Sequence, residues 1–387
     1  MCVHGQQKEV INTALSIVAS SVTVHLLSQS CTATVNAQRS LIAIRCTASN
    51  LEPPFAAHST WLSMQNSELS RRKMIASIGL LAGTCNSQNA AEGPLANSAS
   101  AMTTTAKAVP LTFSTYGLPT LSLNQAIEAI GGHGYDGLEI NVASTSRTAT
   151  EKLTTAQRKE ARKRLNDRGM VIGSLMSHLQ PLSSRERHNE GKRRLERDCI
   201  LARELAPDSP PVIQTILGGK NWGDSKQQCV DRLADWVSIA EEHGVVVAVK
   251  PHRGHAMSRP SEAAWLIAQL DHPKLLRMWF DYSHFIFRDI PLKQSLQQSL
   301  PIMAGVAVKD AIEKEGRVQF LLPGAAGTID YELLCTILRE GNFSGSLCVE
   351  VSSHVWKRPD YDPTVAMSES YDVLSSAMGT KNSSRNR

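Results

Sequence analysis

The chain has 387 residues and a formal net charge of +5, from 41 lysines and arginines against 36 aspartates and glutamates. This excess is small and no basic run is interleaved with aromatic residues, so nucleic acid is not an expected partner. The length suffices for one large domain with its own core and an additional segment.

The first hundred residues differ in organisation from the rest. Residues 67–84 read SELSRRKMIASIGLLAGT, in which Arg71 and Arg72 precede a short apolar run and a tract of small residues. This order is typical of a twin-arginine export signal, although a chance arginine pair before a short buried helix is the alternative. We predict a signal peptide over residues 64–101 and export to the periplasm.

Residues 1–63 precede that signal, and export signals begin at the N-terminus. We therefore expect Met64 to be the true initiator, and residues 1–63 to be a non-native or disordered leader. Their apolar tract is broken by polar residues and is a weak membrane span, and no later stretch is long and apolar enough to cross a bilayer. Residues 381–387 are expected to form a disordered tail.

Eight cysteines are present, and none forms a Cys-x-x-Cys pair. The first hundred residues contain four of them, without metal-binding spacing. For the other four, at positions 199, 229, 335 and 348, export would permit a disulfide, but the sequence selects no pairing. Single buried thiols are the expectation.

From residue 109 onwards, eight short apolar runs alternate with amphipathic stretches of helical length. This alternation predicts parallel strands with helical crossovers, and the count of eight favours a closed (β/α)₈ TIM barrel over residues 105–380 rather than an open doubly wound sheet. Ser225 is a plausible N-cap of one helix, and residues 363–378 would supply the eighth. The runs span residues 109–115, 137–142, 171–179, 212–218, 245–252, 277–284, 305–311 and 346–352.

Chemically capable residues stand at the ends of several runs, where a barrel of this kind has its active site. Charges at such positions must be paired or hydrated, so a functional cluster is favoured over a structural ion network. The last four runs contribute Lys250, His252, His255, Asp281, His284, Lys309 and Glu350, and earlier runs contribute Glu139 and His178.

Several short motifs in this order resemble the sugar phosphate isomerase/epimerase superfamily of xylose-isomerase-like TIM barrels. They are GYDGLEI (134–140), PH (251–252) with FDYSH downstream (280–284), VAVKD (306–310), PGAAGTIDYELL (323–334) and CVEVS (348–352). The resemblance covers residues 110–380 and implies a barrel enzyme acting on carbohydrates.

Members of that superfamily usually bind one divalent metal through a glutamate, an aspartate, a histidine and a glutamate on strands five to eight. The resemblance places Asp281 at the aspartate, Glu350 at the final glutamate and His284 at a frequent substrate-contacting histidine. The fifth-strand glutamate is Lys250 here, and the seventh-strand histidine is Ala307. Half of the expected metal shell is therefore absent.

Three interpretations of this departure remain open. Asp281, Glu350 and His284 could hold a divalent metal (Mn, Mg, Co or Zn) with water completing the shell. Alternatively, Lys250 replaces the metal, either as an ammonium that stabilises an enediolate or as a Schiff-base amine. In the third interpretation Lys250 closes an ion pair in an inactive site.

The resulting functional prediction is proton abstraction next to a carbonyl of a sugar-like substrate. Glu350 is the expected base, tuned towards neutral pH by neighbouring charges, and His252 and His284 would orient hydroxyls. The family implies an isomerase or epimerase; a lyase acting on keto-glycosides and a non-catalytic sugar-binding barrel are the alternatives. The expected partner is a small carbohydrate, and the oligomeric state is open. The candidate substrate contacts are Glu139, His178, Trp222, His255, Lys309 and Trp356.

Overall fold

The computed structural model describes residues 109–380 and four short segments nearer the N-terminus. Those segments form an antiparallel sheet in the order β1-β2-β3-β4, namely Ser21–Leu26, Cys31–Asn36, Leu41–Cys46 and Trp61–Ser63. The predicted signal peptide (64–101) and tail (381–387) lie outside the described residues. The proposed status of residues 1–63 as a leader stays a prediction.

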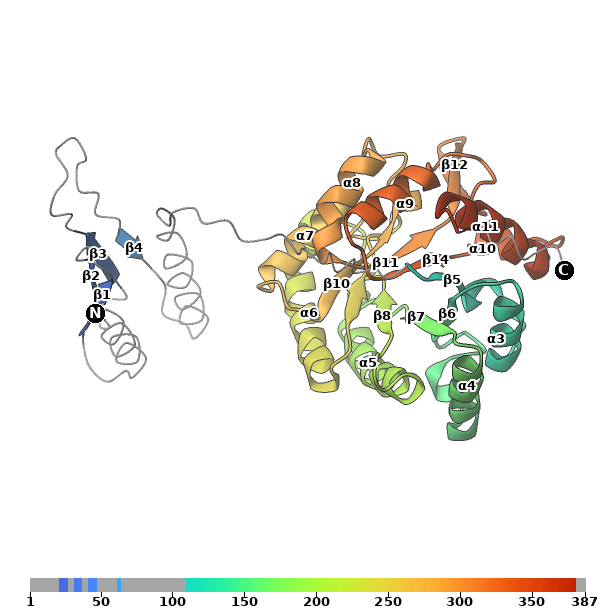
Figure 1. Cartoon of the computed structure of the whole chain (residues 1–387), viewed down its shortest axis with the longest axis horizontal. Helices are drawn as coiled ribbons and strands as arrows, with labels where there is room; N and C mark the ends of the chain where they lie inside the picture. Colours follow the sequence, from blue (N-terminus) through green and yellow to red (C-terminus); the bar gives the residue numbers. More distant parts are fainter. Residues whose placement is uncertain (1–20, 27–30, 37–40, 47–60, 64–108, 381–387) are drawn as a thin grey trace, which may run out of the picture. The chain divides into compact units, whose positions relative to one another are not determined.

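Eight parallel strands close into a barrel, in which each strand pairs with the next barrel strand along the chain and β14 pairs with β5 (Figure 1). Each lies within a predicted run or overlaps most of it. The TIM-barrel prediction is therefore confirmed, and the open sheet is excluded. The strands are β5 (Leu111–Ser114), β6 (Gly137–Asn141), β7 (Val171–Met176), β8 (Val212–Thr215), β9 (Val247–Val249), β10 (Leu276–Asp281), β11 (Met303–Val308) and β14 (Ser346–Val349).

Helices lie outside the ring of strands and cover its outer surface (Figure 1). The longer ones are α3 (Leu123–Gly132), α4 (Thr155–Asp167), α5 (Arg185–Leu205), α6 (Trp222–His243), α7 (Pro260–Gln269), α8 (Leu292–Ser299), α9 (Tyr331–Glu340) and α11 (Pro363–Ala377), with a single turn, α10, at Ser353–Trp356. Within the described segments, no helix combines the length and apolarity needed to cross a bilayer.

One predicted helix start was wrong. Helix α6 begins at Trp222 with Asn221 in the N-cap position, so Ser225 lies within the first turn and its N–H bonds to the Asn221 carbonyl. Gly223 lies inside the helix, so the glycine-containing stretch before Ser225 belongs to its first turn. The helix ends at Gly244, which adopts the left-handed conformation with φ 62°.

A hairpin between β11 and α9 was not predicted. Its strands are β12 (Asp310–Lys314) and β13 (Arg317–Leu321), joined by Glu315 and Gly316, which both have positive φ. Two such residues form the tight turn that suits the twist of a hairpin.

One layer of the barrel interior consists of a large aromatic side chain surrounded by small ones. Trp279 is fully buried and packs with Ala248, Ala307 and Cys348. Gly305 allows this ring to fit, because a Cβ at that position would lie 2.0 Å from the indole. This apolar layer forms a floor beneath the next inward-facing side chains.

The four cysteines of the barrel are buried and free, as expected. Burial raises the pKa of the Cys199 and Cys229 thiols to about 12. These thiols are therefore packing groups rather than nucleophiles.

Candidate active site

Side-chain alternation places four charged residues at the C-terminal end of the barrel. Each follows a residue of the floor around Trp279 by two positions, and side chains two apart on a strand face the same way. The four are Lys250 after β9, Asp281 at the end of β10, Lys309 after β11 and Glu350 after β14.

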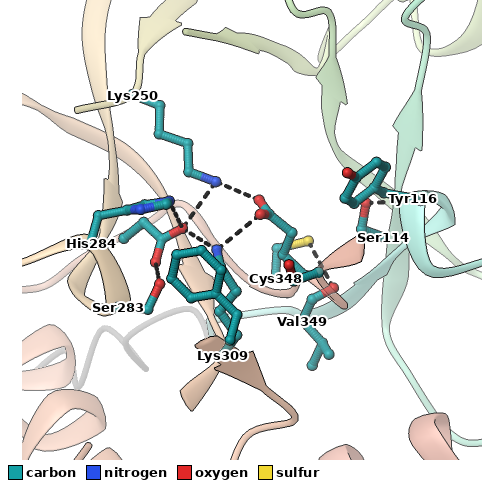
Figure 2. Close-up of polar contacts among 12 residues, drawn as sticks. Ser114, Tyr116, Lys250, Ser283, His284, Lys309, Cys348 and Val349 are labelled. Carbon is teal, nitrogen blue, oxygen red and sulfur yellow. Dashed lines mark hydrogen bonds and ion pairs between the residues drawn. The ribbon is translucent and has the colours of Figure 1, made fainter. Parts of the chain in front are cut away.

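These four side chains form a closed network of ion pairs. The Lys250 ammonium lies 3.0 Å from Oδ2 of Asp281 and also contacts Oε2 of Glu350. The Lys309 ammonium contacts Asp281 and lies 2.9 Å from Oε1 of Glu350. Figure 2 shows the two lysines reaching the same carboxylates from opposite sides. Each carboxylate is thus shared by two ammonium groups.

The network is buried, and its most accessible member is Glu350. Asp281 is fully buried and Lys309 is 1% exposed, whereas Glu350 is 8% exposed. The Ser283 hydroxyl donates to the other oxygen of Asp281 over 2.6 Å. Asp281 is therefore enclosed by protein donors, and Glu350 is the carboxylate that a substrate can approach.

The charges keep one another ionised. Burial alone would raise the pKa of Glu350, but Lys250 and Lys309 outweigh it and hold the pKa at about 2. The pKa of Asp281 is likewise held well below its usual value, by Lys309 and then Lys250. Burial works against the charge on Lys250, yet Glu350 and Asp281 raise its pKa. The expected tuning of Glu350 towards neutral pH was wrong, because the two lysines outweigh burial and the nearby charge of Asp281.

A protonated Lys250 lacks the lone pair that a Schiff base requires. The two bound carboxylates therefore favour the electrostatic interpretation of this lysine over the covalent one.

Neutral histidines border the network. The ring centroids of His252 and His284 are 4.1 Å apart, and His255 lies 4.6 Å from His252. Burial lowers the pKa of His284 to about 4 and lowers that of His252 as well. His284 Nε2 is 3.4 Å from Asp281 Oδ2, too loose an arrangement to form a hydrogen bond. Both ring nitrogens of His284 are therefore without a hydrogen-bond partner among the described residues, whereas Nδ1 of His252 accepts from the Gly254 N–H.

The unpredicted hairpin adds an aromatic cover. Phe320 on β13 places its ring 5.2 Å from the Lys309 ammonium and edge-on to His284 at 5.0 Å. Its backbone N–H donates to Nδ1 of His354, whose ring stacks on the phenyl group. The sequence feature that could have predicted this hairpin is the Glu315-Gly316 pair, which lies between two segments of alternating apolar and polar residues.

Glu139 lies in the other half of the barrel interior. It is 1% exposed, and its carboxylate accepts bonds from Ser114, Ser174 and Gln214 at 2.6, 2.6 and 3.1 Å. Burial, followed by the nearby Glu350 charge, raises its pKa. Three protein donors on a buried carboxylate give Glu139 a structural position rather than open contact with substrate.

The remaining predicted residues separate into two groups. His178 and Trp356 both lie near Tyr116, with ring centroids 6.2 and 5.7 Å from it, at the edge of the mouth. Trp222 instead packs edge-on against Trp265 of α7 at 5.6 Å, which is ordinary helix packing. Tyr116 carried no recognisable motif in the sequence.

The residues present do not fit a divalent metal. Two ammonium groups already occupy the carboxylate oxygens that would bind the ion, and a further cation would be repelled by both. No cluster of three or more histidine, cysteine or carboxylate ligands occurs in the described part of the chain. Lys250 and Ala307 stand where the resemblance implies two ligands.

Comparison with known proteins is consistent with this architecture. The family described as xylose isomerase-like TIM barrel matches residues 127–376. No curated protein matches the chain.

Solved structures with the same fold share little sequence with this chain. The E. coli 3-keto-D-glucoside 4-epimerase YcjR is 18% identical, with a TM-score of 0.56, over 69% of this chain and 99% of that one. The probable 3-DHS dehydratase AsbF of Bacillus anthracis is 17% identical, with a TM-score of 0.57, over 69% and 98%. A xylose isomerase-like barrel of Mycobacterium smegmatis, in complex with magnesium, is 15% identical, with a TM-score of 0.54, over 70% and 99%.

Proposed function

Because the chain belongs to the xylose isomerase-like TIM barrel family, we propose that it is a carbohydrate isomerase or epimerase in which lysine ammonium groups replace the metal ion. The observation that carries the proposal is the position of Lys250 between Asp281 and Glu350. Opposite charges buried at the catalytic end of a barrel form a preorganised electrostatic site.

In the proposed reaction the substrate carbonyl oxygen accepts a hydrogen bond from Lys250. Glu350 removes a proton from the adjacent carbon, and the electron pair moves onto the carbonyl oxygen to give an enediolate. The ammonium stabilises that oxygen. Isomerisation is completed when the hydroxyl proton of the neighbouring carbon moves to the enediolate oxygen and Glu350 returns its proton to the former carbonyl carbon. Epimerisation is completed when a donor other than Glu350 protonates the original carbon from its opposite face, while Glu350 releases its proton to solvent.

A carboxylate with a pKa of about 2 is a weak base in the resting site. The low value depends on Lys250 and Lys309, so it rises when the enediolate oxygen draws Lys250 away from Glu350. Base strength and oxyanion stabilisation are thereby coupled through one ammonium. His252 and His284, both neutral, orient substrate hydroxyls.

The deciding experiment is a substrate screen with free, phosphorylated and 3-keto sugars, the last suggested by the epimerase of the same fold. Isomerisation or epimerisation leaves the mass unchanged and alters retention or the NMR spectrum. Products of lower mass would replace the proposal with the lyase alternative. Ligand-dependent thermal shifts without any product would indicate a sugar-binding barrel.

Export remains part of the proposal. Substitution of both Arg71 and Arg72 by lysine is expected to retain the protein in the cytoplasm with its barrel folded. Localisation by fractionation, with Arg162→Lys at an exposed position on α4 as a control, tests this. Unchanged export of the double variant would refute a twin-arginine signal.

A further inference from the structure

A hollow lies beside the mouth of the barrel, apart from the lysine network. It has a volume of about 360 Å³ and is bounded by the segment after β6 (143–145), the segment after β7 (178–183) and one side of α5. The α5 residues are Arg187, Glu190, Gly191 and Arg194, whose spacing places them on one face of the helix. The hollow is therefore built by two active-site loops and a helix.

Arg194 lines this hollow and has an unmet hydrogen-bonding requirement. Its Nη2 atom is buried and has no acceptor among the residues that the structure describes. A buried donor without a partner costs free energy that an acceptor on a ligand would recover. Arg187 adds a second positive charge and Glu190 one negative charge, so the charged side chains of the lining carry a net charge of +1.

His178 lies close enough to the lysine network for the charges of Glu350 and Lys250 to act on its imidazole. It lines the hollow and meets the ring of Tyr116, which stands at the barrel mouth. His178 and Gln180 have φ values of 32° and 47°, in the left-handed region that residues other than glycine rarely adopt. Strained backbone of this kind is concentrated at ligand-binding segments.

We propose that this hollow binds an anionic group, a carboxylate or a phosphate, on the part of the substrate remote from the reacting carbonyl. The planar guanidinium of Arg194 matches either anion in bidentate geometry. Ser183 and Gln180 supply further polar groups at the rim. The role as a substrate subsite rests on the proposed function, whereas the anion site itself does not.

The test is direct binding to the full chain by isothermal titration calorimetry. The probes are methyl glucuronide, glucose 6-phosphate and neutral methyl glucoside, and the tighter of the two acidic probes identifies the anion. Arg194→Gln should weaken binding of the acidic probe about 10- to 100-fold, the usual effect of losing a hydrogen bond to a charged group. Arg194→Lys keeps the positive charge but loses the bidentate guanidinium geometry, so its affinity for the acidic probe should lie between those of Arg194→Gln and the unaltered protein.

The matched control is Arg193→Gln, an exposed position on the same helix that does not line the hollow. Arg193→Gln should bind the acidic probe with the affinity of the unaltered protein. Equal affinity in Arg194→Gln, an equal loss in Arg193→Gln, equal binding of methyl glucoside, or no acidic binding at millimolar concentration would each overturn the proposal. Lys250→Met separates the two proposals, because it should lower kcat at least 10²- to 10³-fold and leave binding of methyl glucuronide, which has no ketone or aldehyde carbonyl and binds in a hollow that Lys250 does not line, unchanged.

Discussion

The ammonium of Lys250 lies 3.0 Å from Oδ2 of Asp281, at the ends of two adjacent strands. Lys309 reaches the same oxygen from the other side. Two cations and two anions balance within the network, so the buried site is neutral overall. Removing one member leaves an uncompensated charge in a region of low dielectric.

Lys250→Met tests the catalytic role of that ammonium. The methionine keeps the apolar stem but leaves Asp281 and Glu350 with only Lys309 between them. We expect kcat to fall at least 10²- to 10³-fold, as when one oxyanion donor is lost, and the free energy of unfolding to fall by about 3 kcal/mol. Lys293→Met, at an exposed position on α8, is the control. A kcat within twofold of the unaltered enzyme would contradict the role.

Chelation tests whether a metal takes part. Because two ammonium groups occupy the carboxylate oxygens, we expect full activity after treatment with a chelator and no stoichiometric metal by elemental analysis. Lys250→Glu rebuilds one ligand of the usual shell and should introduce binding of a divalent ion, weakened by Ala307. A tightly bound metal in the natural protein, with activity abolished by its removal, would favour the metal interpretation.

The barrel could be predicted from the sequence because parallel strands buried on both faces are short apolar runs. The charged network could also be predicted, since Lys250, Asp281 and Glu350 lie near the C-terminal ends of their runs. The position of Lys309 was harder to predict. The sequence suggested a substrate contact, whereas the side chain turns inwards, because Ala307 two positions earlier faces the barrel interior.

What the sequence did not reveal depends on contacts between distant segments. Phe320 covers the site only because the hairpin folds back over the barrel mouth. Glu139 lies within a predicted run and was a substrate-contact candidate, but three donors from other strands of the barrel enclose it. Burial would raise the pKa of Glu350, but Lys250 and Lys309, which come from two different strands, together lower it.

The free energy of unfolding should decrease in two stages as the pH is lowered. His284 has a folded pKa of about 4 against an ordinary 6.5, so its contribution is present above pH 6.5 and is lost as the pH falls towards 4. Glu350 has a folded pKa of about 2 against an ordinary 4.5, so its contribution is lost between those values. Urea unfolding from pH 7.5 to 3 should show both losses, and His284→Gln should reduce the first. A constant free energy of unfolding over that range would contradict both assignments.

Phe320→Ala tests whether the hairpin excludes water from the lysine network. The ring lies over Lys309 and against His284, so its loss admits water and weakens the interaction between the buried charges. A desolvated cation–π contact contributes about 2 kcal/mol, and kcat should therefore fall roughly 10- to 30-fold. Phe320→Leu keeps the apolar cover and should recover much of this loss, whereas Gln319→Ala, at the exposed neighbouring position, should have no effect.

If Phe320→Leu is as slow as Phe320→Ala, the aromatic ring itself is required rather than exclusion of water. Unchanged kcat in Phe320→Ala would show that the hairpin does not cover the reacting groups.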